Sequence, residues 1–141
     1  MKKIIGRLEK VSFPAFQLHN IDAKIDTGAY TSSIHCKKAK EVVVDGVTHL
    51  EFVLLDKRNG AYNGQVIRVK EYSIKTVKSS NGIQQNRFAI KTKMQLFQKT
   101  YTIELTLSNR KEMKFPILLG RKFLTKKFIV DTALSYTNKN T

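Results

Sequence analysis

Apolar and polar residues alternate along much of this 141-residue chain with the two-residue period of a β-strand. In the clearest run, single polar residues separate four apolar side chains: Tyr101, Ile103, Leu105 and Leu107. Successive side chains of a strand point to opposite faces, so residues 101–107 are predicted to form a half-buried strand. Further strands are predicted where β-branched and aromatic residues gather, at residues 42–44, 50–55, 65–77 and 88–94.

Glycines mark the expected turns between these strands. Four of the seven glycines directly follow Asn or Asp, at Asp45-Gly46, Asn59-Gly60, Asn63-Gly64 and Asn81-Gly82. Both central residues of a type I′ hairpin turn have positive φ, which Gly, Asn and Asp adopt more readily than other residues. We therefore expect tight hairpins at these four positions.

Helical periodicity is nearly absent. The only helix expected is one or two turns at residues 122–127, before a last strand at residues 128–130. Many short strands with one short C-terminal helix predict an all-β fold, either a barrel or a sandwich. Residues 1–135 are expected to form a single domain and residues 136–141 a polar, frayed tail.

The charge of the chain is strongly positive. Twenty-six Lys and Arg residues face 11 Asp and Glu residues, which gives a net charge of +15. The basic residues are spread over the whole chain, so the surface should favour anionic partners such as nucleic acid, a ribosomal surface or an acidic peptide. A solvated surface that only keeps the protein soluble is the competing interpretation. No stretch approaches the roughly 18 apolar residues of a membrane-spanning helix, and the single cysteine excludes an intrachain disulfide. We expect a soluble cytoplasmic protein without a membrane partner.

The sharpest local motif is a strand that runs into Asp26-Thr27-Gly28. Gly28 permits close approach of a second backbone, and the Thr27 hydroxyl can hydrogen-bond across it. If a second copy of the loop met the first about a symmetry axis, two Asp26 carboxylates would share one proton, because like charges that close cannot both ionise. Such a pair can activate water against an amide and protonate the leaving nitrogen. The competing interpretation is a local turn in which Asp26 accepts from its own backbone.

A second motif, at residues 115–121, is an apolar strand that ends in Gly120-Arg121. Residues 25–29 and 117–121 together resemble the retropepsin-like aspartic proteases. The match is closer still to a bacterial family of small proteins labelled ATP-dependent zinc proteases and associated with RimK-type ATP-grasp ligases. Three segments carry it, residues 26–35, 104–110 and 113–121, and the resemblance spans roughly residues 5–135.

This resemblance implies a closed or partly closed β-barrel that acts as a homodimeric aspartic endopeptidase, with one catalytic Asp26 per subunit braced by Thr27 and Gly28. The strand that ends at Gly120 is expected to thread beside the catalytic loop and pack under it. A hairpin flap is expected over the cleft at residues 77–88, with residues 56–65 as the second choice.

Four further residues are expected to bind substrate or support the loop: Ala29, Tyr30, Gly120 and Arg121. Retropepsins usually carry a carboxylate at the position of Tyr30, where it pairs with the arginine of the Gly-Arg motif. Arg121 therefore needs another partner, and Asp131 is one candidate. Asp131-Thr132-Ala133 also resembles a degraded copy of the Asp26 loop, but too few residues follow it to build a second lobe, so we favour a structural role for Asp131.

The sequence gives little support for a zinc site, although the family is labelled as zinc proteases. Zinc needs three or four ligands at defined spacing, and the candidates are scattered: His19, His35, Cys36 and His49. In a strand, His35 and Cys36 would point to opposite faces. We therefore predict no metal or cofactor, and we expect Cys36 to be a small buried hydrophobe. A zinc-dependent peptidase remains an alternative.

Two predictions concern partners. RimK-type ligases add glutamates to protein tails, so the resemblance and the positive charge together suggest an acidic, glutamate-rich peptide substrate. The alternative is a non-catalytic basic module that binds RNA or a ribosomal surface. Nucleic acid is not favoured, because aromatic residues rarely interleave with the basic ones.

Overall fold

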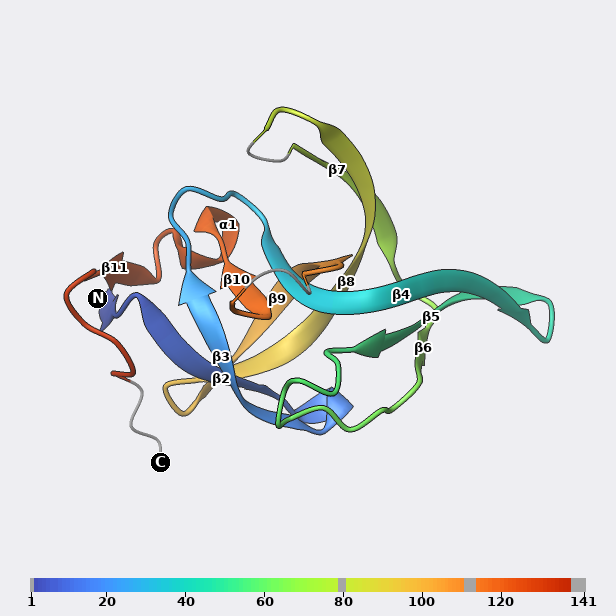
Figure 1. Ribbon diagram of the computed structural model, residues 1–141, viewed down its shortest axis with the longest axis horizontal. Helices are drawn as coiled ribbons and strands as arrows, with labels where there is room; N and C mark the ends of the chain where they lie inside the picture. The colour runs from blue at the N-terminus through green and yellow to red at the C-terminus, as the bar shows by residue number, and fades with distance from the viewer. Residues whose placement is uncertain (1, 79–80, 111–113, 138–141) are drawn as a thin grey trace.

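The computed structural model describes residues 2–78, 81–110 and 114–137, and strands dominate it (Figure 1). The elements in chain order are β1 (Lys3–Ile5), β2 (Leu8–Phe13), the 3-10 turn η1 (Pro14–Phe16), β3 (Leu18–Ile25), β4 (Ser32–Val44), β5 (Val47–Leu54), β6 (Ile67–Val69), β7 (Ser73–Lys78), β8 (Gln84–Leu96), β9 (Lys99–Ser108), β10 (Ile117–Leu119), α1 (Arg121–Leu124) and β11 (Phe128–Val130).

The sheet closes into a barrel because β10 lies between β3 and β4. Leu119 pairs in parallel with Ile25 of β3, and Ile117 pairs antiparallel with Ile34 of β4. The strand order β10-β3-β2-β8-β9-β4 therefore returns to β10. A strand with neighbours on both sides inside a barrel needs apolar side chains, which the Ile-Leu-Leu sequence of β10 supplies. The prediction of an all-β fold, a closed or partly closed barrel with one short C-terminal helix, is confirmed.

Two hairpins extend beyond the closed ring. The distal parts of β4 and β5 pair from Cys36 with Leu54 out to Val44 with Val47, and they form the long arm at the right of Figure 1. The strand β7 pairs with β8, from Ser73 with Ala89 to Lys78 with Gln84, and this hairpin rises at the top of the view.

A cluster of buried apolar side chains fills the core, and its largest fully buried members are Ile5, Phe13, Leu18, Ile21, Ile34, Leu50, Phe52, Leu55, Met94, Leu96, Leu105 and Ile117. Glu9 is buried beside this cluster, where it accepts the Gly6 N–H at 2.8 Å and the Thr137 hydroxyl at 2.5 Å. The Tyr136 N–H donates to the Leu8 carbonyl at 2.7 Å. These bonds attach residues 136 and 137 of the expected tail to the start of β2, and residues 138–141 of that tail lie outside the described residues.

The turn prediction was right for Asp45-Gly46 and wrong for Asn59-Gly60 and Asn63-Gly64. Asp45 and Gly46 form the tight β4–β5 turn, with φ values of 51° and 78°. By contrast, Asn59-Gly60 and Asn63-Gly64 fall in one loop between β5 and β6. Their Asn side chains accept local backbone N–H groups, from Ala61 at 2.8 Å and Gln65 at 3.0 Å, and so build Asx turns instead of hairpins.

Other predicted elements are present, with small shifts in their first and last residues. The last strand is at residues 128–130 as expected, whereas the helix begins one residue earlier and ends at Leu124. Residues 101–107 lie within β9, but Thr106 is buried against the alternation pattern. Its hydroxyl donates to the Ser32 carbonyl at 3.2 Å, which satisfies the buried polar group. Within the described part of the chain, no helix has the length and apolar character to cross a membrane.

Candidate functional site

The Asp26 loop begins where β3 ends, at Ile25. The Asp26 N–H donates to the Leu119 carbonyl of β10 at 2.9 Å, and Asp26 Oδ1 accepts the Gly28 N–H at 3.0 Å. The Ala29 N–H donates back to the Asp26 carbonyl at 3.2 Å. The local turn that we considered as a competing interpretation is therefore present. A carboxylate has two oxygens with several acceptor sites, so this turn fixes the half-buried Asp26 without exhausting its chemistry.

Gly120 lies directly beneath this loop. Its N–H donates to the buried Ser32 hydroxyl at 3.0 Å. A Cβ atom at this position would lie 2.6 Å from the Thr31 carbonyl oxygen, 2.7 Å from that of Tyr30 and 2.9 Å from that of Ala29. Only a glycine lets β10 approach so closely. The strand thus threads beside the Asp26 loop and packs under it, as the family resemblance implied.

The first residues of α1 hold the other side of the loop. The Arg121 N–H donates to the Ala29 carbonyl at 2.8 Å, and its Nη1 donates to the Thr27 carbonyl at 2.9 Å. The guanidinium also lies 5.8 Å from the centroid of the exposed Tyr30 ring, within the range of a cation–π contact. Arg121 therefore finds its partners within the Asp26 loop. The suggested partner Asp131 instead accepts the Ala133 N–H at 2.9 Å, in its own turn after β11.

Arg110 lies within electrostatic reach of Asp26, and Arg87 lies within reach of Arg110. Burial and, after it, the neighbouring Arg87 guanidinium lower the pKa of Arg110, while the Asp26 carboxylate acts in the opposite direction. Arg87 belongs to β8, in the part that pairs with β7, and Arg110 follows the end of β9. Neither Arg87 nor Arg110 was predicted from the sequence to have a role in the site, although Arg110 ends one of the three segments that carry the family resemblance.

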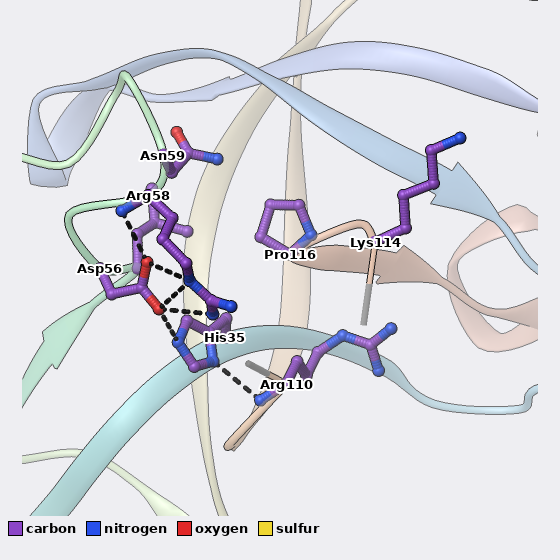
Figure 2. Close-up of a pocket in the computed structure, with 8 residues that line it drawn as sticks. His35, Asp56, Arg58, Asn59, Arg110, Lys114 and Pro116 are labelled. Atoms are coloured by element: carbon purple, nitrogen blue, oxygen red, sulfur yellow. Dashed lines mark hydrogen bonds and ion pairs between the residues drawn. The ribbon is translucent and has the colours of Figure 1, made fainter. Parts of the chain in front are cut away.

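His35 joins several of these segments (Figure 2). The side chain is buried in β4, and its backbone N–H donates to the Pro116 carbonyl at 2.8 Å. Its Nδ1 accepts the Arg110 backbone N–H at 2.8 Å. An amide N–H can only donate, so Nδ1 must carry the lone pair and the proton belongs to Nε2. Nε2 then donates to Asp56 Oδ2 at 2.9 Å.

Arg58 also binds the Asp56 carboxylate, through both of its oxygens. Arg58 Nη2 lies 2.7 Å from Asp56 Oδ2, and the Arg58 backbone N–H donates to Oδ1 at 2.9 Å. These bonds from Arg58, with the smaller contribution of His35, hold the pKa of Asp56 well below its usual range, although burial opposes them. Asp56 is therefore ionised and fixed.

These residues line a pocket of about 170 Å³ between β4, the loop after β5 and the segment before β10. Its walls consist of His35, Leu55, Asp56, Arg58, Asn59, Arg110, Lys114 and Pro116. Three of these eight side chains are cationic and one is a carboxylate, and the eight come from segments that are far apart in the sequence.

The candidate zinc ligands do not converge. In the described ranges, no three His, Cys, Asp or Glu side chains are grouped so that they could hold a metal ion. Both ring nitrogens of His35 already have hydrogen-bond partners. Cys36 is buried as predicted, its Sγ donates to the Lys38 carbonyl at 3.2 Å, and burial raises the pKa of its thiol to about 11. A protonated, buried thiol is a poor zinc ligand.

The two candidate flap segments differ in how they are held. The β7–β8 hairpin spans the first choice, residues 77–88, although Ser79 and Ser80 lie outside the described residues. The second choice, residues 56–65, is anchored to the barrel, because Asn63 Nδ2 donates to the Phe16 carbonyl at 3.1 Å and to the Gln17 carbonyl at 3.2 Å. A segment tied down at both Asp56 and Asn63 is poorly suited to open and close.

Comparison with known proteins gives matches over nearly the whole chain. A family model described as RimB-like, retropepsin-like aspartic endopeptidase RimB, matches residues 4–141. A Desulfotalea psychrophila protein named probable alpha-L-glutamate ligase is 39% identical over 94% of this chain and 29% of its own length. A protein of the same name from Shewanella pealeana is 35% identical over 96% of this chain and 30% of its own length. The crystal structure of a Legionella pneumophila protein of unknown function has a TM-score of 0.77 and 29% identity, covering 99% of this chain and 100% of that one.

This chain spans only 29% to 30% of the length of the two curated relatives. Their ligase name describes proteins with a large additional region, so it does not transfer to this chain. The family model, by contrast, covers both the Asp26 loop and the Gly120-Arg121 motif. The chain belongs to the RimB-like family of retropepsin-like aspartic endopeptidases.

Proposed function

We propose that this protein is an aspartic endopeptidase that acts as a homodimer, with one catalytic Asp26 from each chain. The observation that carries the proposal is the fixed position of Asp26. Its backbone is bound to Leu119 of the threaded strand and its carboxylate to Gly28, at the carboxyl end of β3. Family membership supports the same reaction class.

The chemistry follows from the presence of two such loops in one site. When two Asp26 carboxylates face each other, mutual repulsion keeps one of them protonated. The ionised carboxylate takes a proton from water as the water attacks the amide carbon, and the protonated one hydrogen-bonds to the carbonyl oxygen. Transfer of a proton to the leaving nitrogen then completes the cleavage. Thr27 and Gly28 would pack against their counterparts and keep the two carboxylates in register.

The terminal strands offer a surface for the second copy. The strands β1 and β11 form a separate two-stranded parallel sheet, in which Ile4 is the neighbour of Ile129. Both side chains are more than half exposed, at 53% and 55%. An exposed apolar pair on a short sheet is suited to burial against another subunit.

The remaining parts of the proposed enzyme have distinct roles. The β7–β8 hairpin would serve as the flap over bound substrate, because it extends beyond the ring (Figure 1) and carries Arg87 opposite Lys75. The net charge of +15 supports an acidic peptide as substrate, and the glutamate ligase name of the relatives agrees with that choice.

A comparison of three purified proteins tests the proposal. Wild type, Asp26→Asn and Asp131→Asn are assayed against a diverse peptide library, and their oligomeric state is measured by sedimentation. We expect wild type and Asp131→Asn to cleave and Asp26→Asn to dimerise without cleaving. Cleavage by Asp26→Asn, or a monomeric wild type that cleaves, would refute the proposal.

A further inference from the structure

The pocket around Arg110 has an excess of positive charge that its own acidic group does not offset. Arg58, Arg110 and Lys114 line it, and Asp56 is the only carboxylate among the described lining residues. Asp56 is already bound by Arg58 and His35. In Figure 2, Asp56 and Arg58 lie on one side of the pocket, while Arg110 and Lys114 lie on the other. The latter two cations therefore stand apart from the carboxylate.

Arg110 is also fixed in place before any ligand binds. Its backbone N–H donates to His35 Nδ1 at 2.8 Å, and its Nε donates to the Phe115 carbonyl at 3.3 Å. The second bond is long, but it uses the nitrogen nearest the side-chain stem. A guanidinium held by Nε can still present its two outer nitrogens to a planar anion. Such pre-organisation lowers the entropy lost on binding.

The position of this pocket connects it with the proposed catalytic centre. Pro116 lines the pocket and directly precedes β10. Lys114 stands three residues before β10, the strand whose far end binds the Asp26 backbone. The pocket and the Asp26 loop thus lie at the two ends of β10, so a peptide bound at the loop can place a side chain in the pocket.

We propose that Arg110 and Lys114 form a subsite of the peptidase cleft that binds the side-chain carboxylate of an acidic substrate residue near the scissile bond. This proposal rests on the proposed function. It assigns specificity to Arg110 and Lys114, and it makes His35 a positioning residue, because His35 holds the Arg110 backbone and is itself oriented by Asp56.

The residues that line the site favour the binding of a peptide carboxylate over the binding of nucleic acid. Proteins that bind single strands combine a basic track along the backbone with aromatic side chains on which bases stack. Here the described lining residues include no Phe, Tyr or Trp, and both ring nitrogens of the one imidazole, His35, are already hydrogen-bonded. A carboxylate matches the paired donors of a guanidinium.

Binding can be tested without cleavage in the full-length Asp26→Asn protein. Two labelled alanine-based decapeptides are compared, one with two central Glu residues and the other with Gln in their place. We expect the Glu peptide to bind about tenfold more tightly or better, as is typical of a charge-assisted contact. Adding Arg110→Gln and Lys114→Gln should abolish this preference, whereas adding Arg110→Lys should restore part of it relative to Arg110→Gln.

A matched control and a competitor complete the design. Arg68→Gln removes a cation on β6 that is 2.7 Å from Glu51, and it should leave the peptide preference unchanged. Thermal unfolding verifies that each variant is folded. A Glu preference that survives in the Arg110→Gln, Lys114→Gln protein overturns the proposal. So does a single-stranded RNA oligonucleotide that binds more tightly than the Glu peptide and depends on the same two residues.

Cleavage assays separate the failure of this inference from the failure of the proposed function. If wild type cleaves neither peptide but the Asp26→Asn protein prefers Glu through Arg110, the subsite stands and the peptidase does not. If wild type cleaves both peptides equally, and Arg110→Gln cleaves them as wild type does, the peptidase stands and the subsite is refuted.

Discussion

The backbone N–H of Asp26 donates to the carbonyl oxygen of Leu119 at 2.9 Å, which joins two segments from opposite ends of the sequence. This bond continues the parallel pairing of β3 with β10, and it ends where the Asp26 loop begins. The position of the proposed catalytic carboxylate is thus set by the strand beneath it.

Gly120→Ala should disrupt the Asp26 loop. The new Cβ would meet three backbone carbonyl oxygens at 2.6 to 2.9 Å, and backbone cannot move aside as a flexible side chain can. Overpacking of this kind typically costs about 1–3 kcal/mol of the free energy of unfolding. Denaturant unfolding measures the loss. Gly60→Ala is the matched control, because its Cβ would meet nothing within 4 Å, and an equal loss in both variants would contradict this account.

Replacement of His35 should depend on which ring nitrogen is imitated. His35→Ala leaves the Arg110 N–H without its acceptor, and an unsatisfied buried donor costs about 1–3 kcal/mol. His35→Asn keeps an acceptor oxygen close to the former position of Nδ1, although it loses the bond to Asp56. We therefore expect Asn to retain more stability than Ala, as measured by chemical denaturation. Equal stabilities of the two variants would show that the Arg110 contact contributes little.

Asp56 should make the stability of the protein depend on pH under acidic conditions. Its pKa lies below the ordinary value of 3.8 in the folded state, because Arg58 and His35 favour the ionised form. The stabilisation is therefore fully present well above pH 3.8 and is lost as the pH falls from there through the folded-state pKa. The difference in unfolding free energy between wild type and Asp56→Asn should shrink in that range.

The control for this titration is Asp45→Asn. Asp45 has a positive φ in an exposed turn, and Asn adopts that conformation equally well. The difference between wild type and this variant should stay nearly constant over the same pH range. If Asp56→Asn follows the flat profile of Asp45→Asn, the Asp56 carboxylate is not stabilised as we infer.

Ile129→Glu should weaken the proposed dimer. The side chain is 55% exposed next to Ile4, so a carboxylate is tolerated in the isolated chain but costly at a dry interface. Sedimentation should show a shift towards monomer with a parallel loss of cleavage. Val43→Glu, on the β4–β5 arm, has a side chain that is 70% exposed in the wild type and should leave the oligomeric state unchanged. A fully dimeric Ile129→Glu protein would place the interface elsewhere.

The sequence predicted those parts of the fold that depend on local chemistry. The alternation in residues 101–107 follows from the two faces of β9, and Gly120 was singled out because its motif ends an apolar strand. Asp45-Gly46 formed the predicted turn, since both residues adopt positive φ. In each case the signal lies within a few adjacent residues.

Features that depend on distant contacts were missed. The turn between β8 and β9 uses Phe97 and Gln98, with φ values of 55° and 62°, at residues that rarely adopt this conformation. The buried Phe97 ring packs 5.9 Å from that of Phe128, and this tertiary contact offsets the unfavourable backbone. His35, Asp56 and Arg110 also come together only when the barrel closes, so their contacts could not be predicted from any local sequence pattern.

The most direct test of the shared active site is the activity of mixed subunits. Wild type and Asp26→Asn are unfolded together, refolded at varying ratios and assayed at constant total protein. If each site needs Asp26 from both chains, activity follows the square of the wild-type fraction, so an equal mixture retains about one quarter of the wild-type activity. A linear decline, with about one half retained, would show that a single Asp26 is sufficient and would contradict the central claim.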